Sequence, residues 1–474
     1  MLFPLAVAII AREWNAALDF LIGFCACLLA GFFLVLICAR GKRPISWTHG
    51  MVVASFSWII GMLLAAIPYY LSGHYLSYLD ACFDVMSGFT TTGLTLIQDL
   101  DHAGYALNMW RHVLTYLGGQ GMVVFALTFL MNDAGGAFKI YVGEAKDEKL
   151  LPNVRNTARA IWFISVVYLL VGTLIFTLVA LGEGIKMPRA FLHGLWLFMG
   201  GWSTGGFAPM SQNILYYHSL LIELFTIIFF TVGSFNFALH YAVWSGDRQE
   251  LRKNVEIISF TITLILLTLL TTVGFMKAKI YPDWMAVFRK GFYHLISGHT
   301  TTGFMTVYAR QFINDWGELA LLALIIAMLI GGSASSTAGG FKGLRMGILF
   351  HALREDVRRL LRPETSVLVE KFHHLREVVL GERHVRMALM IIVLYVFMFA
   401  VGTVGGLLAG YPILEAMFEA ASVTGNVGLS AGVTTPATPW GLKVLYIIMM
   451  WLARLEFMSV FAMFAYIAAG LKNR

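Results

Sequence analysis

Short runs of threonine and glycine recur four times along this chain of 474 residues. SGFTTTGLT spans residues 87–95, SGHTTTGFMT at 297–306 nearly repeats it, and WSTGGFAP at 202–209 and SVTGNVGLSAG at 422–432 are related to it. Because glycine permits positive φ, the backbone carbonyls beside it can turn toward a common axis. Rings of carbonyl oxygens replace the hydration shell of a cation in selectivity filters. The chemistry that these runs favour is therefore cation binding by backbone oxygen.

A structural role is the alternative, because small residues such as threonine and glycine also let membrane helices pack closely. For one run alone, close packing would be the better interpretation. Four runs in equivalent positions favour a filter, with Gly93, Gly206, Gly303 and Gly428 in register. The candidate ligands are Thr91, Thr92, Gly93, Thr204, Gly205, Gly206, Thr301, Thr302, Gly303, Asn426, Val427 and Gly428.

Each run follows an apolar segment that is too short to cross a bilayer as a helix. Asp80, Pro188, Asp283 and Pro412 precede these four segments, and such residues are favoured at helix N-termini. We therefore expect four half-helices whose C-terminal, partly negative ends point inward and stabilise a cation. The repeating unit is a helix, a half-helix, the motif and a second helix.

Composition identifies the environment of these units. The chain is 58% hydrophobic and 13% charged, with a mean hydropathy of +0.75, far outside the range of soluble domains. Segments of about 20 apolar residues predict nine full spans, whereas residues 2–11 form a stretch too short to cross. The expected spans begin near Ala16, Met51, His112, Ala160, Leu215, Glu256, Glu318, Met387 and Gly441.

The basic residues predict the orientation. Placing the loop at 40–48 in the cytoplasm assigns 23 of the 34 lysines and arginines to that side, as the positive-inside rule requires. This asymmetry accounts for the net charge of +7 without a nucleic-acid partner. The four cysteines have no metal-ligand spacing, and we expect neither a disulfide nor a resident cofactor.

Together with RHVLTYLGGQGMVV (111–124), GGSASSTAGGFKGLR (331–345) and WLARLEF (451–457), the four glycine runs resemble the Trk/Ktr/HKT superfamily of potassium transporters, most closely its TrkH branch. The resemblance implies an all-α multispanning protein of a bacterial plasma (inner) membrane, with four helix–pore-helix–filter–helix repeats around one central pore and a short N-terminal helical extension. It also implies K⁺ as the transported ion at the filter residues, a homodimer among membrane lipids, and a cytosolic, nucleotide-binding, TrkA-like regulatory ring. In the plant branch, serine at the first filter glycine accompanies sodium transport, so Gly93 favours potassium.

The expected organisation follows the repeats. Residues 1–48 form an N-terminal extension with one full span, 49–132 pore repeat 1, 133–247 pore repeat 2, 248–350 pore repeat 3, 351–386 a cytoplasmic linker and 387–474 pore repeat 4. For the linker, a membrane-surface amphipathic helix and a contact with the regulatory ring are equally compatible with its mixture of apolar and basic residues. His299, in the third filter motif, is expected at the outer mouth.

Two features are candidates for a gate. GGSASSTAGG at 331–340 interrupts an otherwise continuous apolar segment, and its glycines disfavour a rigid helix. A simple kink is the alternative to the mobile loop that the family places beneath its filter, and shortening a mobile loop should raise flux. Arg454 lies inside the last expected span, where an arginine either snorkels or faces a polar interior; by family resemblance it projects into the pore. The candidate gating residues are Gly331, Gly332, Ser333, Ser335, Ser336, Gly339, Gly340 and Arg454.

Two other classes of protein are alternatives to an ion pathway of this kind. A membrane enzyme is disfavoured because the sequence has neither an HExxH motif nor a paired-aspartate motif, and it also has no GxxxxGK[ST] loop for a nucleotide. A sodium- or proton-coupled carrier of potassium or sodium is the nearer alternative, but carriers with broken helices usually show inverted repeats. Here the four units run in the same direction.

Overall fold

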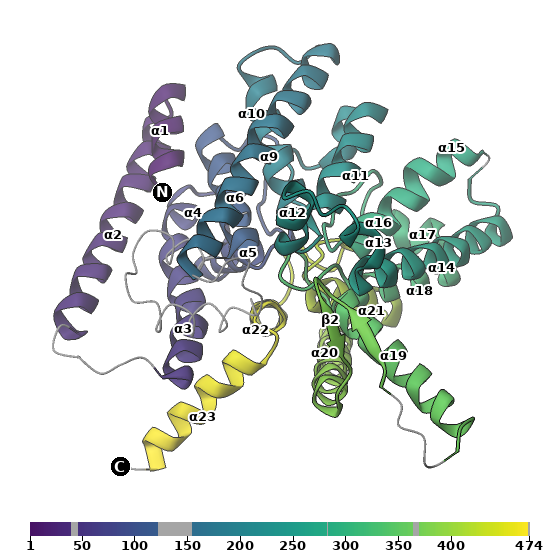
Figure 1. Cartoon of the computed structure of the whole chain (residues 1–474). Coiled ribbons are helices and arrows are strands. Elements are labelled where there is room, and N and C mark those ends of the chain that lie inside the picture. Colours follow the sequence, from purple (N-terminus) through teal and green to yellow (C-terminus); the bar gives the residue numbers. More distant parts are fainter. Residues whose placement is uncertain (39–45, 122–153, 282, 364–368, 473–474) are drawn as a thin grey trace.

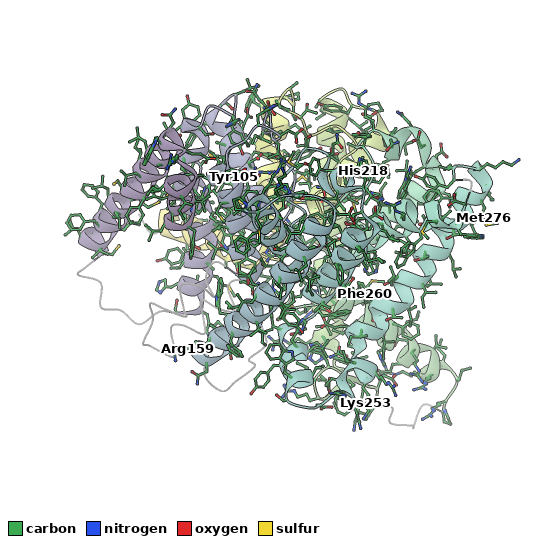
Figure 2. All side chains as sticks on the ribbon, turned by 90° about the horizontal axis from the view of Figure 1, so that it is seen from above. Tyr105, Arg159, His218, Lys253, Phe260 and Met276 are labelled. Atoms are coloured by element: carbon green, nitrogen blue, oxygen red, sulfur yellow. The ribbon has the colours of Figure 1, made fainter. Side chains whose placement is uncertain are left out.

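A computed structural model describes residues 1–38, 46–121, 154–281, 283–363 and 369–472 as a predominantly helical bundle (Figure 1). The basic residues at 40–43 and 139–149, and the predicted boundary between repeats 1 and 2 at residue 132, lie outside these ranges. Seen from above, the N-terminal helices lie at one edge of the bundle, with Tyr105 on that half and Met276 at the opposite edge (Figure 2).

The N-terminal extension consists of α1 (Leu2–Ala11) and α2 (Trp14–Cys38). Helix α1 is as short as expected and packs against both α2 and α6 (Tyr105–Gln120). Ala8 and Phe20 are buried in this contact, whereas Phe32 and Phe33 near the end of α2 are exposed. Exposed phenylalanines on a long apolar helix are what a lipid-facing segment requires.

The four repeats follow in chain order. In the first, α3 (Trp47–Ala65), α4 (Ile67–Leu71), the half-helix α5 (Tyr78–Phe89) and α6 are described. The second contains α9 (Val154–Gly182), the half-helix α10 (Arg189–Trp202), the 3₁₀ turn η1 (Asn213–Tyr217), α11 (Leu220–Gly233) and α12 (Phe237–Trp244). The third contains α13 (Glu250–Lys253), α14 (Val255–Ala278), a half-helix made of α15 (Trp284–Ala286), η2 (Val287–Phe292) and α16 (Tyr293–His299), then α17 (Gln311–Asp315), α18 (Gly317–Ile330) and α19 (Gly343–Leu360). The fourth contains α20 (Glu382–Leu408), the half-helix α21 (Ile413–Gly425), α22 (Trp440–Arg454) and α23 (Met458–Lys472).

Of the nine expected spans, seven are found among the described helices, and the one expected from His112 continues beyond Gly121, outside the described residues. Five are single helices long and apolar enough to cross a membrane, and two more are bent pairs, α11 with α12 at 97° and α22 with α23 at 108°. The spans expected from Leu215 and Gly441 are therefore not straight. The segment from Glu318 is also broken, because α18 ends at Ile330 and α19 begins at Gly343. All three breaks come at polar or glycine-rich sequence, where backbone groups find partners other than the helix itself.

The starts of the half-helices agree with the sequence in three repeats. Pro188 and Pro412 occupy the N-cap positions of α10 and α21, and the Asp283 carboxylate accepts the Ala286 N–H at 2.7 Å. In the first repeat the cap is Ser77, whose hydroxyl accepts the Asp80 N–H at 3.2 Å. Asp80 is therefore not the capping residue, and its carboxylate has a different partner.

The first long helix after the filter motif of each repeat packs against the half-helix of the next repeat. The contacts are α6 with α10, α11 with α16, α18 with α21 and, closing the circle, α22 with α5. The four half-helices are thus surrounded by a closed ring of helices from different parts of the chain. Lys443 of α22 fastens the closing contact, because its Nζ lies 2.6 Å from the Asp80 carboxylate of α5 and both side chains are buried.

We expect Asp80→Ala to destabilise the protein by about 3–5 kcal/mol, because it leaves the Lys443 ammonium buried without its counter-ion. The measurement is the thermal unfolding midpoint in detergent. Asp80→Ala combined with Lys443→Met removes both charges and should recover most of the loss, since paired apolar replacements of buried ion pairs are often neutral. Equal midpoints for the single and double variants would contradict this account of the closing contact.

The predicted cytoplasmic linker combines helix and strand. Helix α19 runs across residue 350 and is followed by a hairpin of β1 (Lys371–His373) and β2 (Glu377–Val379), which is antiparallel. Glu370, just before β1, binds His351 and Arg358 of α19 at 3.0 and 2.9 Å. Burial alone would raise the pKa of Glu370, but the His351 hydrogen bond and the arginines hold it below its ordinary value. The hairpin is thus fixed to α19 on the side of the molecule that also carries the C-terminus (Figure 1).

Candidate ion-conduction site

The backbone leaves all four half-helices in the same way. The first motif residue, Thr91, Thr204, Thr301 or Asn426, has φ between 49° and 56°. The N–H of the next residue returns to the carbonyl five positions earlier, at 2.8–2.9 Å in every repeat. A left-handed residue at a helix C-terminus ends the helix and satisfies its free carbonyls. The four runs that align in the sequence therefore have one shared backbone conformation.

The four register glycines come together in a closed ring. Their φ values are 87°, 62°, 82° and 93°, which glycine adopts without strain. A Cβ atom on Gly93 would lie 2.5 Å from the Gly205 carbonyl oxygen, closer than real Cβ atoms come to any atom. A Cβ atom on any of the other three glycines would lie closer still to a carbonyl oxygen of the next repeat. The pairs are Gly206 with Thr302, Gly303 with Val427 and Gly428 with Thr92.

This ring brings all twelve predicted ligand residues into four adjacent strands. Each glycine faces the carbonyl that precedes the corresponding glycine of the next repeat, in the order 1, 2, 3, 4 and back to 1. Eleven of these twelve residues are buried, and Gly93 is partly exposed. In the described residues no group of three or more His, Cys, Asp and Glu side chains is placed to hold a metal ion. The four strands themselves carry neutral backbone and hydroxyl oxygens, which are suited to a weakly hydrated cation.

The segment 331–342 lies against the base of these strands and is not helical. The predicted interruption at 331–340 is therefore a loop and not a kink within a helix. The hydroxyl of Thr337 contacts repeat 2 twice, accepting from Thr204 Oγ1 at 3.1 Å and donating to the Gly233 carbonyl at 2.8 Å. The Gly339 N–H donates to Thr301 Oγ1 at 2.8 Å. Left-handed threonines of the filter strands thus hold the loop in place.

Glycine is needed in this loop for close approach. A Cβ on Gly339 would collide with the Gly425 carbonyl at the end of α21, and one on Gly331 would collide with Gly339 itself. Thr337 was not among the candidate gating residues, although it lies within the quoted run. Its hydroxyl, one of four in that run, was the only signal that the sequence offered.

Arg454 is the last residue of α22, and its guanidinium reaches the same loop. Nη1 donates to the Thr337 carbonyl at 2.7 Å and to Thr91 Oγ1 at 3.1 Å, and Nη2 donates to the Gly118 carbonyl at 2.7 Å. Because the chain bends by 108° immediately after this residue, the side chain turns into the bundle and does not follow a straight helix toward the membrane surface. The snorkelling alternative is therefore wrong.

A second cluster lies at the same bend and was not found from the sequence. Glu456 forms ion pairs with Lys342, at 2.5 Å, and with Arg345, and all three side chains are largely buried. Lys342 and Arg345 flank the start of α19, directly after the loop. The pairs thus connect the end of the loop to the break between α22 and α23. Residues separated by more than a hundred positions gave no spacing signal.

His299 is not at the outer mouth. It is the last residue of α16 and fully buried, with Nε2 2.7 Å from Thr263 Oγ1 of α14 and its ring against Phe260. Its side chain points toward α14, which packs outside the half-helix, and away from the filter strands. The expectation failed because position in a motif does not fix the direction of a side chain.

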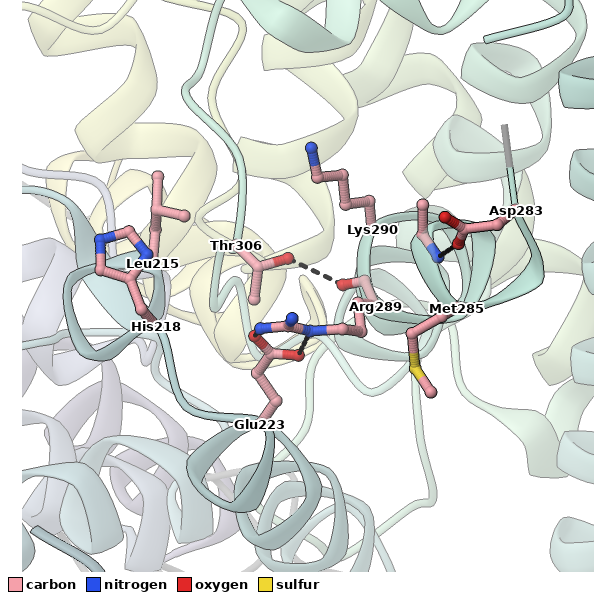
Figure 3. A pocket seen from close by; sticks show the side chains of 9 residues that line it. Leu215, His218, Glu223, Asp283, Met285, Arg289, Lys290 and Thr306 are labelled. Carbon is pink, nitrogen blue, oxygen red and sulfur yellow. Dashed lines mark hydrogen bonds and ion pairs between the residues drawn. The ribbon is translucent and has the colours of Figure 1, made fainter. Parts of the chain in front are cut away.

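A cavity of about 400 Å³ is lined by residues of the third half-helix, of α11 and of the segment before α11, and by Thr306 (Figure 3). Arg289 of the half-helix donates to both carboxylate oxygens of Glu223 on α11, at 2.9 and 2.6 Å. Thr306, which follows the third filter strand, donates from Oγ1 to the Arg289 carbonyl at 2.9 Å. This bidentate pair thus joins repeats 2 and 3 beside the exit of a filter strand.

Comparisons with known proteins agree with this geometry. The model of the TrkH family, described as "Cation transport protein", matches residues 17–275 and 253–470. An uncharacterised cation transporter of Methanocaldococcus jannaschii is 30% identical over 98% of this chain and 91% of its own length. The Trk system potassium uptake protein TrkG of Escherichia coli is 28% identical over 98% of this chain and 94% of its own.

A solved structure shows the same fold. The crystal structure of the potassium transporter TrkH from Vibrio parahaemolyticus superimposes with a TM-score of 0.81, covering 97% of this chain and 94% of that one, at 24% sequence identity. The helical architecture with its four repeats is therefore that of a known class of membrane transporter, and the expected fold is confirmed.

Proposed function

Since the chain belongs to the TrkH family of cation transport proteins, and is a multi-pass protein of the plasma membrane and not an enzyme, we propose that it takes up potassium through the ring of glycine strands. The observation that carries the proposal is the closed ring itself: four glycines at positive φ, each against a carbonyl of the next repeat. Such a ring offers backbone oxygens at short range and no fixed anionic charge. An interior-negative potential of 100 mV supplies about 2.3 kcal/mol for each charge that enters.

The predicted gate has support from the contacts of the loop at 331–340. Together with Arg454, this loop occupies the base of the strands through Thr91, Thr204 and Thr301. Movement of the loop would open the path below the filter. We place regulation on the hairpin side of the molecule, where a TrkA-type nucleotide-binding ring would meet α19 and β1–β2, and we retain the homodimer as part of the proposal.

The test is uptake of radioactive rubidium into liposomes that contain the purified protein, with a set membrane potential and potassium or sodium as competitor. Uptake that follows the potential and is blocked by potassium but not by sodium is the expected result. Strict dependence on a sodium or proton gradient would instead identify the alternative, a coupled carrier. Absence of uptake both with and without a TrkA-type partner would contradict the proposal.

We expect Gly93→Ser to weaken discrimination between potassium and sodium. Of the four ring glycines Gly93 has the widest space, 2.5 Å to the Gly205 oxygen, so a serine displaces the strand least there. The strand still has to shift, because a side chain at φ 87° is strained by about 1–3 kcal/mol. The measurement is the ratio of rubidium to sodium uptake, and an unchanged ratio in the variant would count against the filter assignment.

A further inference from the structure

Three of the four half-helices hold the exit of their own filter strand with a side chain. The acceptor stands nine residues before the register glycine, and the donor is the backbone N–H three residues after it. The bonds join Asp84 to Leu96 at 2.6 Å, His294 to Thr306 at 2.9 Å and Glu419 to Ala431 at 2.9 Å.

The two carboxylates meet more than one donor. The Asp84 carboxylate also accepts the hydroxyls of Thr95 at 2.6 Å and Tyr75 at 3.0 Å. In the same way Glu419 accepts the Ser430 hydroxyl at 2.9 Å and the Thr434 N–H at 3.0 Å. Thr95 and Ser430 both stand two residues after a register glycine, so these two repeats present a hydroxyl and an N–H together. A carboxylate, with two acceptor oxygens, satisfies both.

In the third repeat the strand presents only one hydrogen-bond donor to His294. The residue two positions after Gly303 is Met305, which has no hydroxyl to donate. His294 Nδ1 lies against the Lys290 carbonyl, to which it donates, so that Nε2 remains as a single acceptor for the Thr306 N–H. One acceptor therefore meets one donor.

The second repeat has neither partner. Nine residues before Gly206 stands Leu197, which is fully buried, and three residues after it stands Pro209, which has no N–H. This strand is held through a carbonyl instead, because Arg111 of α6 donates to Ala208 at 3.1 Å. Its guanidinium also lies over the Phe207 ring, 4.4 Å from the centroid.

We propose that Asp84, His294 and Glu419 are positioning residues that fix the carbonyl positions of their filter strands. In the second repeat Leu197 and Pro209 occupy the same two positions, and the absence of the acceptor is compensated by the absence of the donor. Ordinary satisfaction of buried polar groups explains one such bond. It does not explain why, across all four repeats, the number of acceptors on the half-helix residue rises with the number of donors that the strand presents to it. The inference rests on the proposed function, since it concerns discrimination between ions by those strands.

The physical consequence is a link between these bonds and selectivity. A filter distinguishes ions either by the size of its oxygen cage or by the number and field of its carbonyls, and both depend on where the strands are held. The strand is fixed at its entrance by the helix end and at its exit by the side chain. Loss of the second attachment leaves a buried N–H without a partner and frees the carbonyls to move.

The third repeat allows a test in which its residues are replaced by those of the second repeat. Its one bond, from the Thr306 N–H to His294, occupies the same two positions as Leu197 and Pro209. We compare His294→Leu, His294→Gln and His294→Leu combined with Thr306→Pro, using the full chain in liposomes and the ratio of rubidium to sodium uptake. His294→Leu should lower the ratio about tenfold, equivalent to ~1.4 kcal/mol. His294→Gln keeps an acceptor and should retain the ratio, and the double variant, which reproduces the leucine–proline pair, should recover most of it.

Two controls make the result specific, and a second site serves if the first variant does not fold. Thr306→Val removes the hydroxyl that reaches Arg289 (Figure 3) but keeps the N–H, and it should leave the ratio unchanged. Leu197→Met keeps an apolar side chain at the equivalent position of the second repeat, where Pro209 has no N–H to be accepted, and should also leave the ratio unchanged. If His294→Leu fails to fold, Asp84→Asn and Asp84→Leu repeat the comparison in the first strand. Asparagine keeps one acceptor oxygen for the Leu96 N–H, so the leucine variant should lose more selectivity than the asparagine variant.

Outcomes separate this inference from the function on which it rests. Wild-type protein that does not prefer rubidium to sodium would overturn both. A selective wild type with an equally selective and folded His294→Leu variant would overturn the positioning role alone. So would a double variant no better than His294→Leu, because the leucine–proline pair would then not compensate.

Discussion

Substitution of Gly303 by alanine is expected to reduce potassium uptake by about tenfold to a hundredfold without unfolding the protein. The added Cβ would fall on the Val427 carbonyl oxygen of the next repeat, nearer than any van der Waals contact allows. Gly303 also has φ 82°, so alanine adds backbone strain of about 1–3 kcal/mol. Since the obstacle is backbone, which cannot rotate away, the ring has to open at this point. Each 1.4 kcal/mol of lost stabilisation for a bound ion is a tenfold loss.

The matched control is Gly441→Ala. Gly441 lies in α22, where a Cβ meets no atom within 4 Å, and helical alanine is favoured over glycine. Uptake by this variant should equal that of the wild type. Full uptake by Gly303→Ala, with the same thermal midpoint as the control, would show that the glycine ring is not the path of the ion.

The four-fold character of the site could be predicted from the sequence because it depends on local rules. Glycine at a fixed register after a short apolar helix specifies positive φ, and the four φ values fall between 62° and 93°. Proline and aspartate likewise mark helix starts through bonds made within a few residues. What the alignment did not predict is the left-handed residue two positions before each glycine. It is threonine in three repeats, which seldom adopts this conformation and is held there by the helix end, and Asn426 in the fourth.

Features that depend on contacts between distant residues were not predictable. The apolar sequence from Gly441 to Leu471 reads as one span, and nothing local requires the bend after Arg454. The bend becomes understandable from Glu456, whose partners Lys342 and Arg345 lie in another repeat. His299 shows the same limit, because its burial against Phe260 is set by the packing of α14. Hydropathy thus reports which segments enter the membrane, whereas Arg454 and Glu456 mark where the last of them breaks.

Replacement of Arg454 by glutamine is expected to raise potassium flux through the resting protein by roughly tenfold. The guanidinium joins the Thr337 carbonyl of the loop to the Gly118 carbonyl of repeat 1, at 2.7 Å each. Hydrogen bonds from a charged donor are worth about 1.5–3 kcal/mol, so losing one shifts the loop toward its released state by about a factor of ten or more. Removal of the positive charge beneath the strands also lowers the electrostatic barrier to a cation. The two effects have the same sign.

Arg454→Lys separates these two effects. Lysine keeps the charge, but its single ammonium cannot present the planar, two-nitrogen geometry that reaches both carbonyls. The measurement is rubidium uptake into liposomes at a fixed membrane potential, without a regulatory partner. If bridging the loop to repeat 1 is the larger effect, lysine should raise the flux nearly as much as glutamine. A lysine variant with wild-type flux would assign the closed state to charge alone, and no increase in either variant would remove Arg454 from the gate. In that case the pairs of Glu456 with Lys342 and Arg345 would be the remaining attachment of the loop to the end of α22.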